Sequence, residues 1–236
     1  EVSRGGVIIM DSGRKLAIGS PHLIPKLALI DPELTLGLPP HLTAGTGMDA
    51  FTHNIECFLS NAFNPPADSI ALDGLEKAWT WVERATKDGS DREARYNMAM
   101  AAMEGAMVFQ KGLGAVHALS HPTGGLKGYR LHHGTLNAVY LPAVMRFNEP
   151  AVGEKYRKVA QVMGLPACFS AVGRTGIELA EPQHENGGSE NACSAVDAPE
   201  PCLRFATDAL HHFHSGGERE SHQESRRHQH RQRHRD

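Results

Sequence analysis

The sequence predicts a mainly α-helical protein, preceded by a short extended region and followed by a tail of different composition. Two observations carry this prediction. Between residues 47 and 164, apolar residues recur with helical spacing, and turns rich in Pro and Gly separate the repeats. From residue 169 onward there is no lysine, although eight of the fifteen histidines of the chain occur there. The two stretches are therefore different kinds of sequence.

The chain divides into three parts. Residues 1–36 hold three short apolar runs, at 7–10, 16–18 and 27–30, which favour strands or extended segments. Residues 37–167 form the helical region, and residues 168–236 have too few branched apolar residues to offset the entropy of ordering, so disorder is expected there. Helices are expected near 47–61, 67–87, 91–111, 115–121, 134–148 and 152–163.

One helix start is marked by a specific motif. Ser90-Asp91-Arg92-Glu93 has the capping-box pattern, in which the serine hydroxyl and the glutamate carboxylate each accept a hydrogen bond from a free amide of the first turn. The motif predicts a helix whose N-cap is Ser90.

Composition excludes several classes of function. The chain has 236 residues, 40% of them hydrophobic, and a net charge of −3, which argues against a membrane protein and against nucleic-acid binding by bulk charge. Its four cysteines, Cys57, Cys168, Cys193 and Cys202, lie far apart without a C-x-x-C motif, so neither a disulfide framework nor a thiolate zinc site is expected. We expect a protein of the reducing cytoplasm.

The first group with metal-ligand spacing is the pair Asp49 and His53. Residues four apart on a helix project from the same face, so this carboxylate and this imidazole can bind one divalent ion. An alternative is that Asp49 lies in the first turn of a helix and interacts favourably with the helix dipole, with His53 only a neighbouring polar residue. The pair alone does not decide between the two.

A second pair with the same spacing, His117 and His121, lies in an otherwise apolar stretch. The residue after His117 is alanine, which excludes the H-E-x-x-H motif of metalloproteases. His132 and His133 follow at the start of another predicted helix and can bring a further imidazole to the same point. A carboxylate with several neutral imidazoles suits Fe(II) or Zn(II), whereas Mg(II) and Ca(II) prefer oxygen ligands. Such an ion polarises alcohol and carbonyl oxygens.

Three stretches resemble the iron-containing (group III) alcohol dehydrogenases: residues 47–56, residues 112–125 and residues 133–148. The resemblance covers roughly residues 1–167. It implies that residues 37–167 are the C-terminal helical metal-binding domain of a two-domain α/β + α dehydrogenase, and that residues 1–36 are a remnant of its α/β cofactor domain.

The resemblance also implies roles for individual residues. The metal ligands would be Asp49, His53, His117 and His133, because each matches a ligand position of the family. His121 would help to move the proton of the substrate hydroxyl, and Lys15 would point towards NAD(P), although a solvated surface lysine is the alternative. His132 is assigned outside the ligand set, because only the histidine directly before Gly134 fits the family pattern.

The chain departs from the family at both ends. The Gly-Gly-Gly-Ser loop that cradles the cofactor pyrophosphate in the family is absent, and the tail from residue 168 replaces further helices, for which a translational frameshift is our hypothesis. The function expected is hydride transfer between a small alcohol or aldehyde and NAD(P). A metal- and NAD-dependent lyase resembling dehydroquinate synthase, an inactive metal-binding fragment and a homo-oligomer remain open. Phe51, Phe109 and Leu126 are expected to line the substrate pocket.

Overall fold

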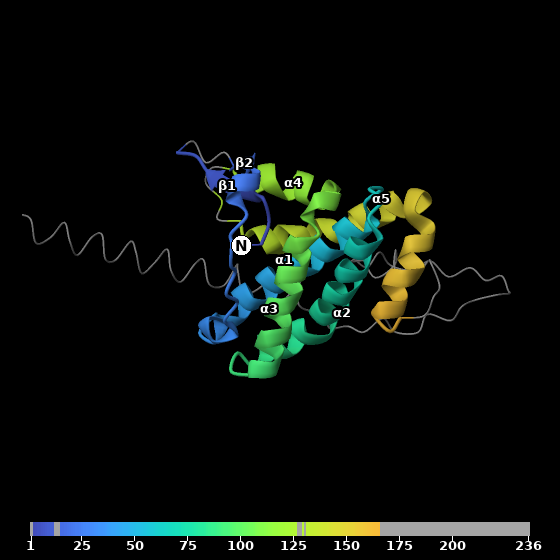
Figure 1. The fold of residues 1–236 in the computed structure, drawn as a ribbon. Coiled ribbons are helices and arrows are strands. Elements are labelled where there is room, and N and C mark those ends of the chain that lie inside the picture. Colours follow the sequence, from blue (N-terminus) through green and yellow to red (C-terminus); the bar gives the residue numbers. More distant parts are fainter. Residues whose placement is uncertain (1, 12–14, 127–128, 130, 166–236) are drawn as a thin grey trace, which may run out of the picture.

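The computed structural model describes residues 2–11, 15–126, 129 and 131–165, and the tail predicted from residue 168 lies outside the described residues. The described chain is mainly α-helical, as the sequence predicts (Figure 1). A hairpin of β1 (Gly5–Ile9) and β2 (Lys15–Gly19) comes first, followed by two short 3-10 helices, Pro21–Leu23 and Pro32–Thr35. The helices are α1 (Pro40–Leu59), α2 (Pro65–Lys87), α3 (Arg92–Met107), α4 (Ala115–Thr123) and α5 (His133–Val162), with a 3-10 turn at Phe109–Lys111.

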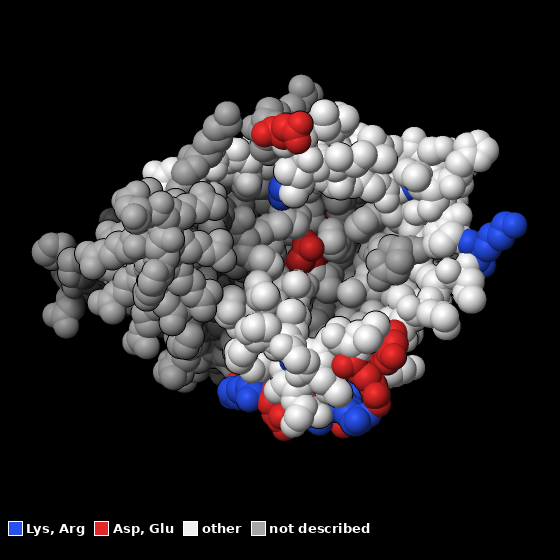
Figure 2. Space-filling model, turned by 90° about the vertical axis from the view of Figure 1, so that its left-hand side faces the viewer, with Lys and Arg blue, Asp and Glu red and all other residues white. Residues whose placement is uncertain are grey.

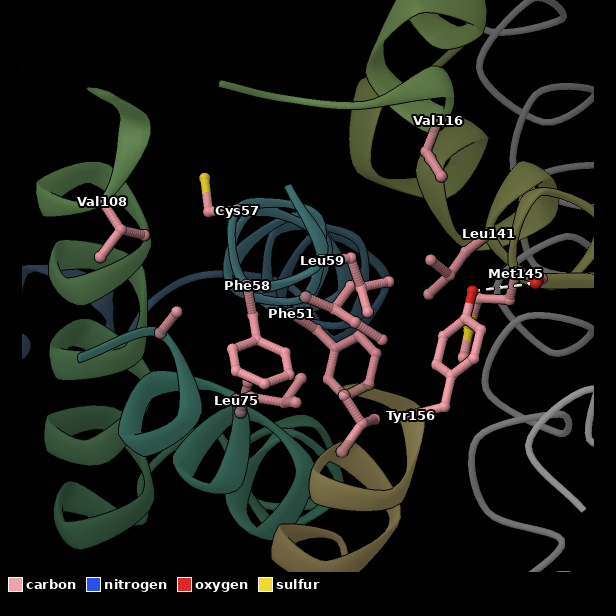
Figure 3. Close-up of a cluster of buried hydrophobic side chains, with 14 of the residues drawn as sticks. Phe51, Cys57, Phe58, Leu59, Leu75, Val108, Val116, Leu141, Met145 and Tyr156 are labelled. Atoms are coloured by element: carbon pink, nitrogen blue, oxygen red, sulfur yellow. Dashed lines mark hydrogen bonds between the residues drawn. The ribbon is translucent and has the colours of Figure 1, made fainter. Parts of the chain in front are cut away.

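Helix α1 is the centre of the packing. It contacts α2, α3 and α5, while α4 packs on α5. The apolar core contains Phe51, Phe58 and Leu75 from α1 and α2, and it reaches Tyr156 on α5 (Figure 3). The Tyr156 hydroxyl donates a hydrogen bond of 2.9 Å to the carbonyl of Met145, so its polar end is satisfied inside the core. Because other helices cover α1 on several sides, polar side chains on one of its faces can be buried as well.

Helix α1 begins seven residues before the predicted start, at Pro40, which fits the preference for proline in the first turn of a helix. This start places Asp49 in the middle of the helix. An interaction with the dipole at the helix N-terminus therefore does not explain Asp49, because that effect is confined to the first turn. The two helices predicted at 134–148 and 152–163 are both present and share the label α5, because they meet at a kink at Val152, where the backbone is non-helical, two residues after Pro150.

The N-cap of α3 is Asp91, so the capping-box prediction is wrong by one residue. The Asp91 carboxylate accepts a hydrogen bond of 3.0 Å from the amide of Ala94, whereas the Ser90 hydroxyl donates to Asp88. Arg84 at the end of α2 pairs with both Asp91 and Glu93. The Glu93 carboxylate therefore forms an ion pair with Arg84 of α2 and does not act as the second half of a capping box.

The N-terminal region is apolar but largely exposed. In the hairpin, Gly5 pairs with Gly19 and Ile9 with Lys15, and the Ile9 side chain is 68% exposed. The third predicted apolar run, 27–30, forms no strand, and Leu29 is 86% exposed. Among the described helices, none combines the length and the hydropathy that crossing a membrane requires.

Helices α1 and α5 approach each other at two glycines. A Cβ atom on Gly134 would overlap the carbonyl oxygen of Gly45 and would lie 3.2 Å from the Cβ of Asp49. A Cβ atom on Gly45 would in turn lie 2.6 Å from the ring of His132. The absence of both side chains lets the first turn of α5 lie directly on α1, beside Asp49.

The substitution Gly134→Ala tests this contact. Because neither backbone can yield without shifting a helix, we expect a loss of roughly 1–3 kcal/mol in the free energy of unfolding, as for other overpacked positions. The control is Gly37→Ala, since a Cβ atom at Gly37 meets nothing within 4 Å. Chemical denaturation measures both variants, and equal stability of the two would contradict the close helix contact.

A buried carboxylate lies between α2 and α3. Glu104 is 7% exposed, its Oε2 has no hydrogen-bond partner, and its Oε1 lies 3.3 Å from the Nζ of Lys77. Burial, aided by repulsion from Asp73 and opposed by Lys77, raises the pKa of Glu104 to about 7. The folded protein therefore favours the protonated carboxyl.

This shift predicts a pH-dependent stability. A raised carboxyl pKa stabilises the fold fully below the pKa of the unfolded chain, near 4.5, and this stabilisation is lost as the pH rises through about 7. Glutamine does not ionise, so Glu104→Gln does not lose stability over this range. The free energy of unfolding of the variant, relative to that of the parent, should therefore rise by up to about 3 kcal/mol between pH 4 and pH 8. Denaturation curves across this range measure the difference, and a difference that does not change with pH would show that Glu104 ionises normally.

Candidate metal centre

Three polar side chains follow one face of α1. Asp49, His53 and Glu56 are four and three residues apart, which places them in a row along the helix. Glu56 is 6% exposed, whereas the side chains of Asp49 and His53 are 27% and 18% exposed. This face is directed at α4 and α5 and not at the apolar core.

Helices α4 and α5 supply the other side of the cluster. The His117 ring on α4 stacks on the His53 ring, with centroids 4.5 Å apart and planes inclined by 19°. The His133 ring, in the first turn of α5, lies 5.3 Å from the His117 ring. Three helices that are distant in sequence thus bring one carboxylate and three imidazoles together.

The distances within the cluster fit a bound transition-metal ion. The Oδ1 atom of Asp49 lies 3.3 Å from the Nε2 of His117 and 3.6 Å from the Nε2 atoms of His53 and His133. Donor atoms around a four-coordinate zinc ion, at about 2.0–2.2 Å from the metal, are roughly 3.3–3.6 Å apart. Asp49, His117 and His133 offer ligand atoms that all lie within 4.8 Å of one another, a set that does not include His53.

Asn137, one turn after His133 on α5, lies inside this cluster. Its fully buried amide donates from Nδ2 to Asp49 Oδ1 at 2.7 Å and lies 3.2 Å from His117 Nε2. Its Oδ1 is buried without a hydrogen-bond partner. The Nδ2 group, and not Oδ1, faces Asp49, His117 and His133, so Asn137 orients the donor atoms of these side chains.

The electrostatics keep two of the imidazoles neutral. Burial lowers the pKa of His53 and of His133 to about 4, against an opposing effect of the Asp49 carboxylate. Burial alone would raise the pKa of Asp49, but a hydrogen bond from His117 and the nearby imidazoles lower it. The cluster therefore offers an ionised carboxylate and two neutral rings, which are the protonation states that metal binding requires.

His117 behaves differently from the other histidines of the cluster. Burial would lower its pKa, but its hydrogen bonds to Asp49 and Glu56 outweigh that effect and raise it. Glu56 Oε2 lies 2.7 Å from the Nδ1 of His117. One ring therefore lies between two carboxylates.

The remaining predicted residues surround the cluster. The His121 ring lies 4.9 Å from that of His133, edge to face, and burial and the positive charges of His117 and Lys15 lower its pKa. A Cβ atom on Gly124, the C-cap of α4, would lie 3.3 Å from the Lys15 Nζ. Strand β2 therefore brings this ammonium group to the C-terminal end of α4, where His121 also lies. His132 is the N-cap residue of α5 and packs on Gly45 outside the cluster.

One of the three expected pocket residues belongs elsewhere. Phe51 is buried in the apolar core (Figure 3), with its ring 6.1 Å from that of Trp79. It lies two residues before His53, so the helical geometry directs it to a different face of α1. The Phe109 ring lies 4.7 Å from the His53 ring and does border the cluster. Leu126 is 52% exposed.

One side of the molecule is hollowed, and charged side chains gather along its lower edge where α2 meets α3 (Figure 2).

Sequence reasoning assigned no role to Glu56 or Asn137. A signal for both was present in the helical spacing, because Glu56 is three residues after His53 and Asn137 is four residues after His133. The spacing could place both residues on the same helix faces as the candidate ligands. Their contacts could not be derived from the spacing, because they depend on how the helices pack.

Comparison with known proteins agrees with this geometry. The sequence profile of the C-terminal part of the Fe-containing alcohol dehydrogenase family matches residues 43–180. The chain belongs to this family. The match includes the stretches that hold all the residues of the cluster, and it supports the resemblance expected from the sequence.

Relatives within the family are named as dehydrogenases of different alcohols. The chain is 57% identical over 192 residues to 4-hydroxybutyrate dehydrogenase of Cupriavidus necator, covering 78% of the chain and 48% of that protein. It is 37% identical over 182 residues to 1,3-propanediol dehydrogenase of Klebsiella pneumoniae, covering 72% and 46%. The chain thus spans about half the length of these relatives.

Solved structures of the family share the fold. A crystal structure of 1,3-propanediol oxidoreductase aligns with a TM-score of 0.66 at 36% identity, covering 73% of this chain and 48% of that chain. The iron-containing alcohol dehydrogenase of Thermococcus thioreducens aligns with a TM-score of 0.64 at 29% identity, covering 73% and 46%. The helical fold described above is that of the C-terminal domain of this family.

The lowered pKa values predict how the metal-free protein titrates. We expect the imidazoles of His53 and His133 to protonate near pH 4, because burial disfavours their charged forms, while exposed histidines protonate near 6.5. Carbon–proton correlation NMR of the ring CH groups measures each midpoint, with His53→Ala and His133→Ala used for assignment. A midpoint of 6 or above for either ring would show that it is solvated and not part of a buried cluster.

Proposed function

We propose that the chain carries the metal and substrate half of an alcohol dehydrogenase, which transfers a hydride between a small alcohol or aldehyde and NAD(P). The observation that carries the proposal is the convergence of Asp49, His53, His117 and His133 from three helices, with three imidazole nitrogens 3.3–3.6 Å from one carboxylate oxygen. These four residues would hold the metal ion. Membership of the family supports the same assignment.

The donor set favours Fe(II) or Zn(II), because imidazole nitrogen with one carboxylate suits these ions better than Mg(II) or Ca(II). When bound, such an ion polarises the substrate oxygen and lowers the pKa of an alcohol. The protein supplies side chains that are already in the protonation states that metal binding requires. Asp49 remains ionised and His53 and His133 remain neutral without a metal, so little proton release is needed from these three side chains.

His121 is the proposed proton carrier. Its ring lies beside those of His117 and His133, and burial with the nearby positive charges lowers its pKa, so it is neutral at pH 7 and can accept a hydroxyl proton. Its position on α4 leaves it partly accessible to solvent, which allows the proton to leave. We assign it no place among the metal ligands.

Lys15 is proposed to face the cofactor. Its ammonium group reaches the end of α4 beside the histidine cluster, while the strand that carries it belongs to the part assigned to the cofactor domain, residues 1–36. In this arrangement the positive charge would interact with NAD(P) at the boundary between the two domains.

The scattered cysteines favour a cytoplasmic protein.

The proposed substrate class is a small alcohol, and 4-hydroxybutyrate is the first compound to test. A relative with 57% identity is named for this compound, and a relative with 37% identity is named for 1,3-propanediol. Phe109 beside His53 supplies an apolar surface next to the proposed metal position.

Metal stoichiometry tests the proposal first. The full chain is loaded with Zn(II) or, under anaerobic conditions, Fe(II), passed through gel filtration and analysed by mass spectrometry. We expect His53→Ala and His133→Ala each to bind one ion fewer per chain than the parent. The control His22→Ala, in a 3-10 helix remote in sequence from the cluster, should bind as many ions as the parent.

Alcohol-dependent formation of NADH by the loaded chain is then measured with 4-hydroxybutyrate and 1,3-propanediol. Activity that disappears in both histidine variants supports a dehydrogenase. An ion that binds without activity would favour the inactive fragment, and turnover without net NADH would favour a lyase that uses NAD transiently. Equal ion counts in the parent and both variants would overturn the proposed site.

A further inference from the structure

We propose that Glu56 is a positioning residue that fixes the orientation and the tautomer of His117, so that Nε2 of this ring faces the metal position. The inference rests on the proposed function, because it concerns the same cluster. Glu56 itself is separated from that position by the imidazole ring, and it would act on the metal only through His117.

The contacts of Glu56 are specific. One carboxylate oxygen, Oε1, accepts a hydrogen bond of 2.7 Å from the amide of Val116, and the other, Oε2, lies 2.7 Å from the Nδ1 of His117. The carboxylate is 6% exposed, so its charge is balanced inside the protein and not by water. Both oxygens are therefore committed to α4.

These contacts fix the helix as well as the ring. The N-cap of α4 is Gly114, which has no side chain to accept from the free amides of the first turn. Glu56 performs that role from α1 by accepting from Val116. A Cβ atom on Gly114 would lie 2.7 Å from Glu56 Oε1, so a glycine is needed for the carboxylate to approach this closely.

Two carboxylates face the His117 ring, and Glu56 is the nearer of them: Glu56 Oε2 lies 2.7 Å from Nδ1, whereas Asp49 Oδ1 lies 3.3 Å from Nε2. An ionised carboxylate only accepts hydrogen bonds, so Nδ1 must carry a proton when it faces Glu56. On the opposite edge of the ring, the Asn137 amide group lies 3.2 Å from Nε2 and donates. In this tautomer the lone pair of Nε2 lies on the side of Asp49 and His133, where the proposed metal ion would receive it. A carboxylate that holds the other nitrogen of a metal-binding histidine is a recurring arrangement in metal sites.

The test is Glu56→Gln. Glutamine has nearly the same shape, but its amide has one acceptor oxygen, so it cannot accept from both Val116 and His117. The matched control is Glu104→Gln, which changes a second buried carboxylate whose ion pair is with Lys77 and not with a histidine. Zn(II) affinity of the full chain is measured by competition with a chromophoric chelator, and the site is defined as the ion that His133→Ala loses.

We expect Glu56→Gln to bind Zn(II) about 10–100-fold more weakly than the parent, the range for loss of such a partner, and Glu104→Gln to bind as the parent does. Gly114→Ala, which pushes on the same carboxylate from α4, should weaken binding in the same direction. Unchanged affinity in a folded Glu56→Gln would overturn the inference while leaving the proposed function intact. A parent that binds no ion at the site would instead overturn the proposed function.

A second readout needs no metal. Long-range nitrogen–proton correlation NMR of the metal-free chain at alkaline pH reports which ring nitrogen carries the proton, with His117→Gln used for assignment. We expect the Nδ1–H form of His117 in the parent and in Glu104→Gln, and a shift towards the Nε2–H form in Glu56→Gln. The same tautomer in all three proteins would contradict the role of Glu56, whatever the zinc measurements show.

Discussion

The close approach of α1 and α5 at Gly45 and Gly134 determines where the polar cluster forms. A side chain at Gly134 would overlap the Gly45 carbonyl oxygen, so the backbones can meet only because both positions are glycine. His133 immediately precedes this contact, and it is thereby held at 3.6 Å from Asp49. The position of a candidate ligand thus follows from backbone packing and not from its own side chain.

Helix α4 is held to the same central helix in another way. It is short, its N-cap is a glycine, and a carboxylate on α1 accepts from its first turn. The interaction that caps α4 also reaches His117, so the stability of this helix and the direction of its imidazole are linked. The polar face of α1 therefore serves packing and chemistry together, while its opposite face, with Phe51, belongs to the apolar core.

The helical fold was largely accessible from the sequence because it depends on local spacing, whereas the four candidate ligands were named from the family resemblance of their motifs. Pairs such as Asp49 with His53 share a helix face wherever the helix begins. The start of α1 was missed by seven residues, since glycines and threonines at 43–47 weaken the apolar pattern although Pro40 begins the helix. The N-cap was assigned to Ser90, because the sequence does not show that Arg84 draws Glu93 to α2.

Contacts between helices were beyond the reach of sequence spacing. The pattern could not show that Phe51 points away from the cluster, that Asn137 lies between two imidazoles, or that Glu56 bonds to a helix sixty residues later. Each depends on how three helices cross, which is decided by side-chain volumes at positions such as Gly45 and Gly134. The candidate ligands were therefore named from the family resemblance of their motifs, whereas the residues that orient them could be found only from the packing of the helices.

The most direct test of the central claim is a crystal structure of the zinc-loaded chain with anomalous diffraction measured on both sides of the zinc absorption edge. The account predicts an anomalous peak between α1, α4 and α5, about 2.0–2.2 Å from Asp49 and from the imidazole nitrogens of the cluster. A helical fold as described with ordered zinc only at other positions would contradict it, because the four side chains would then converge without binding the metal.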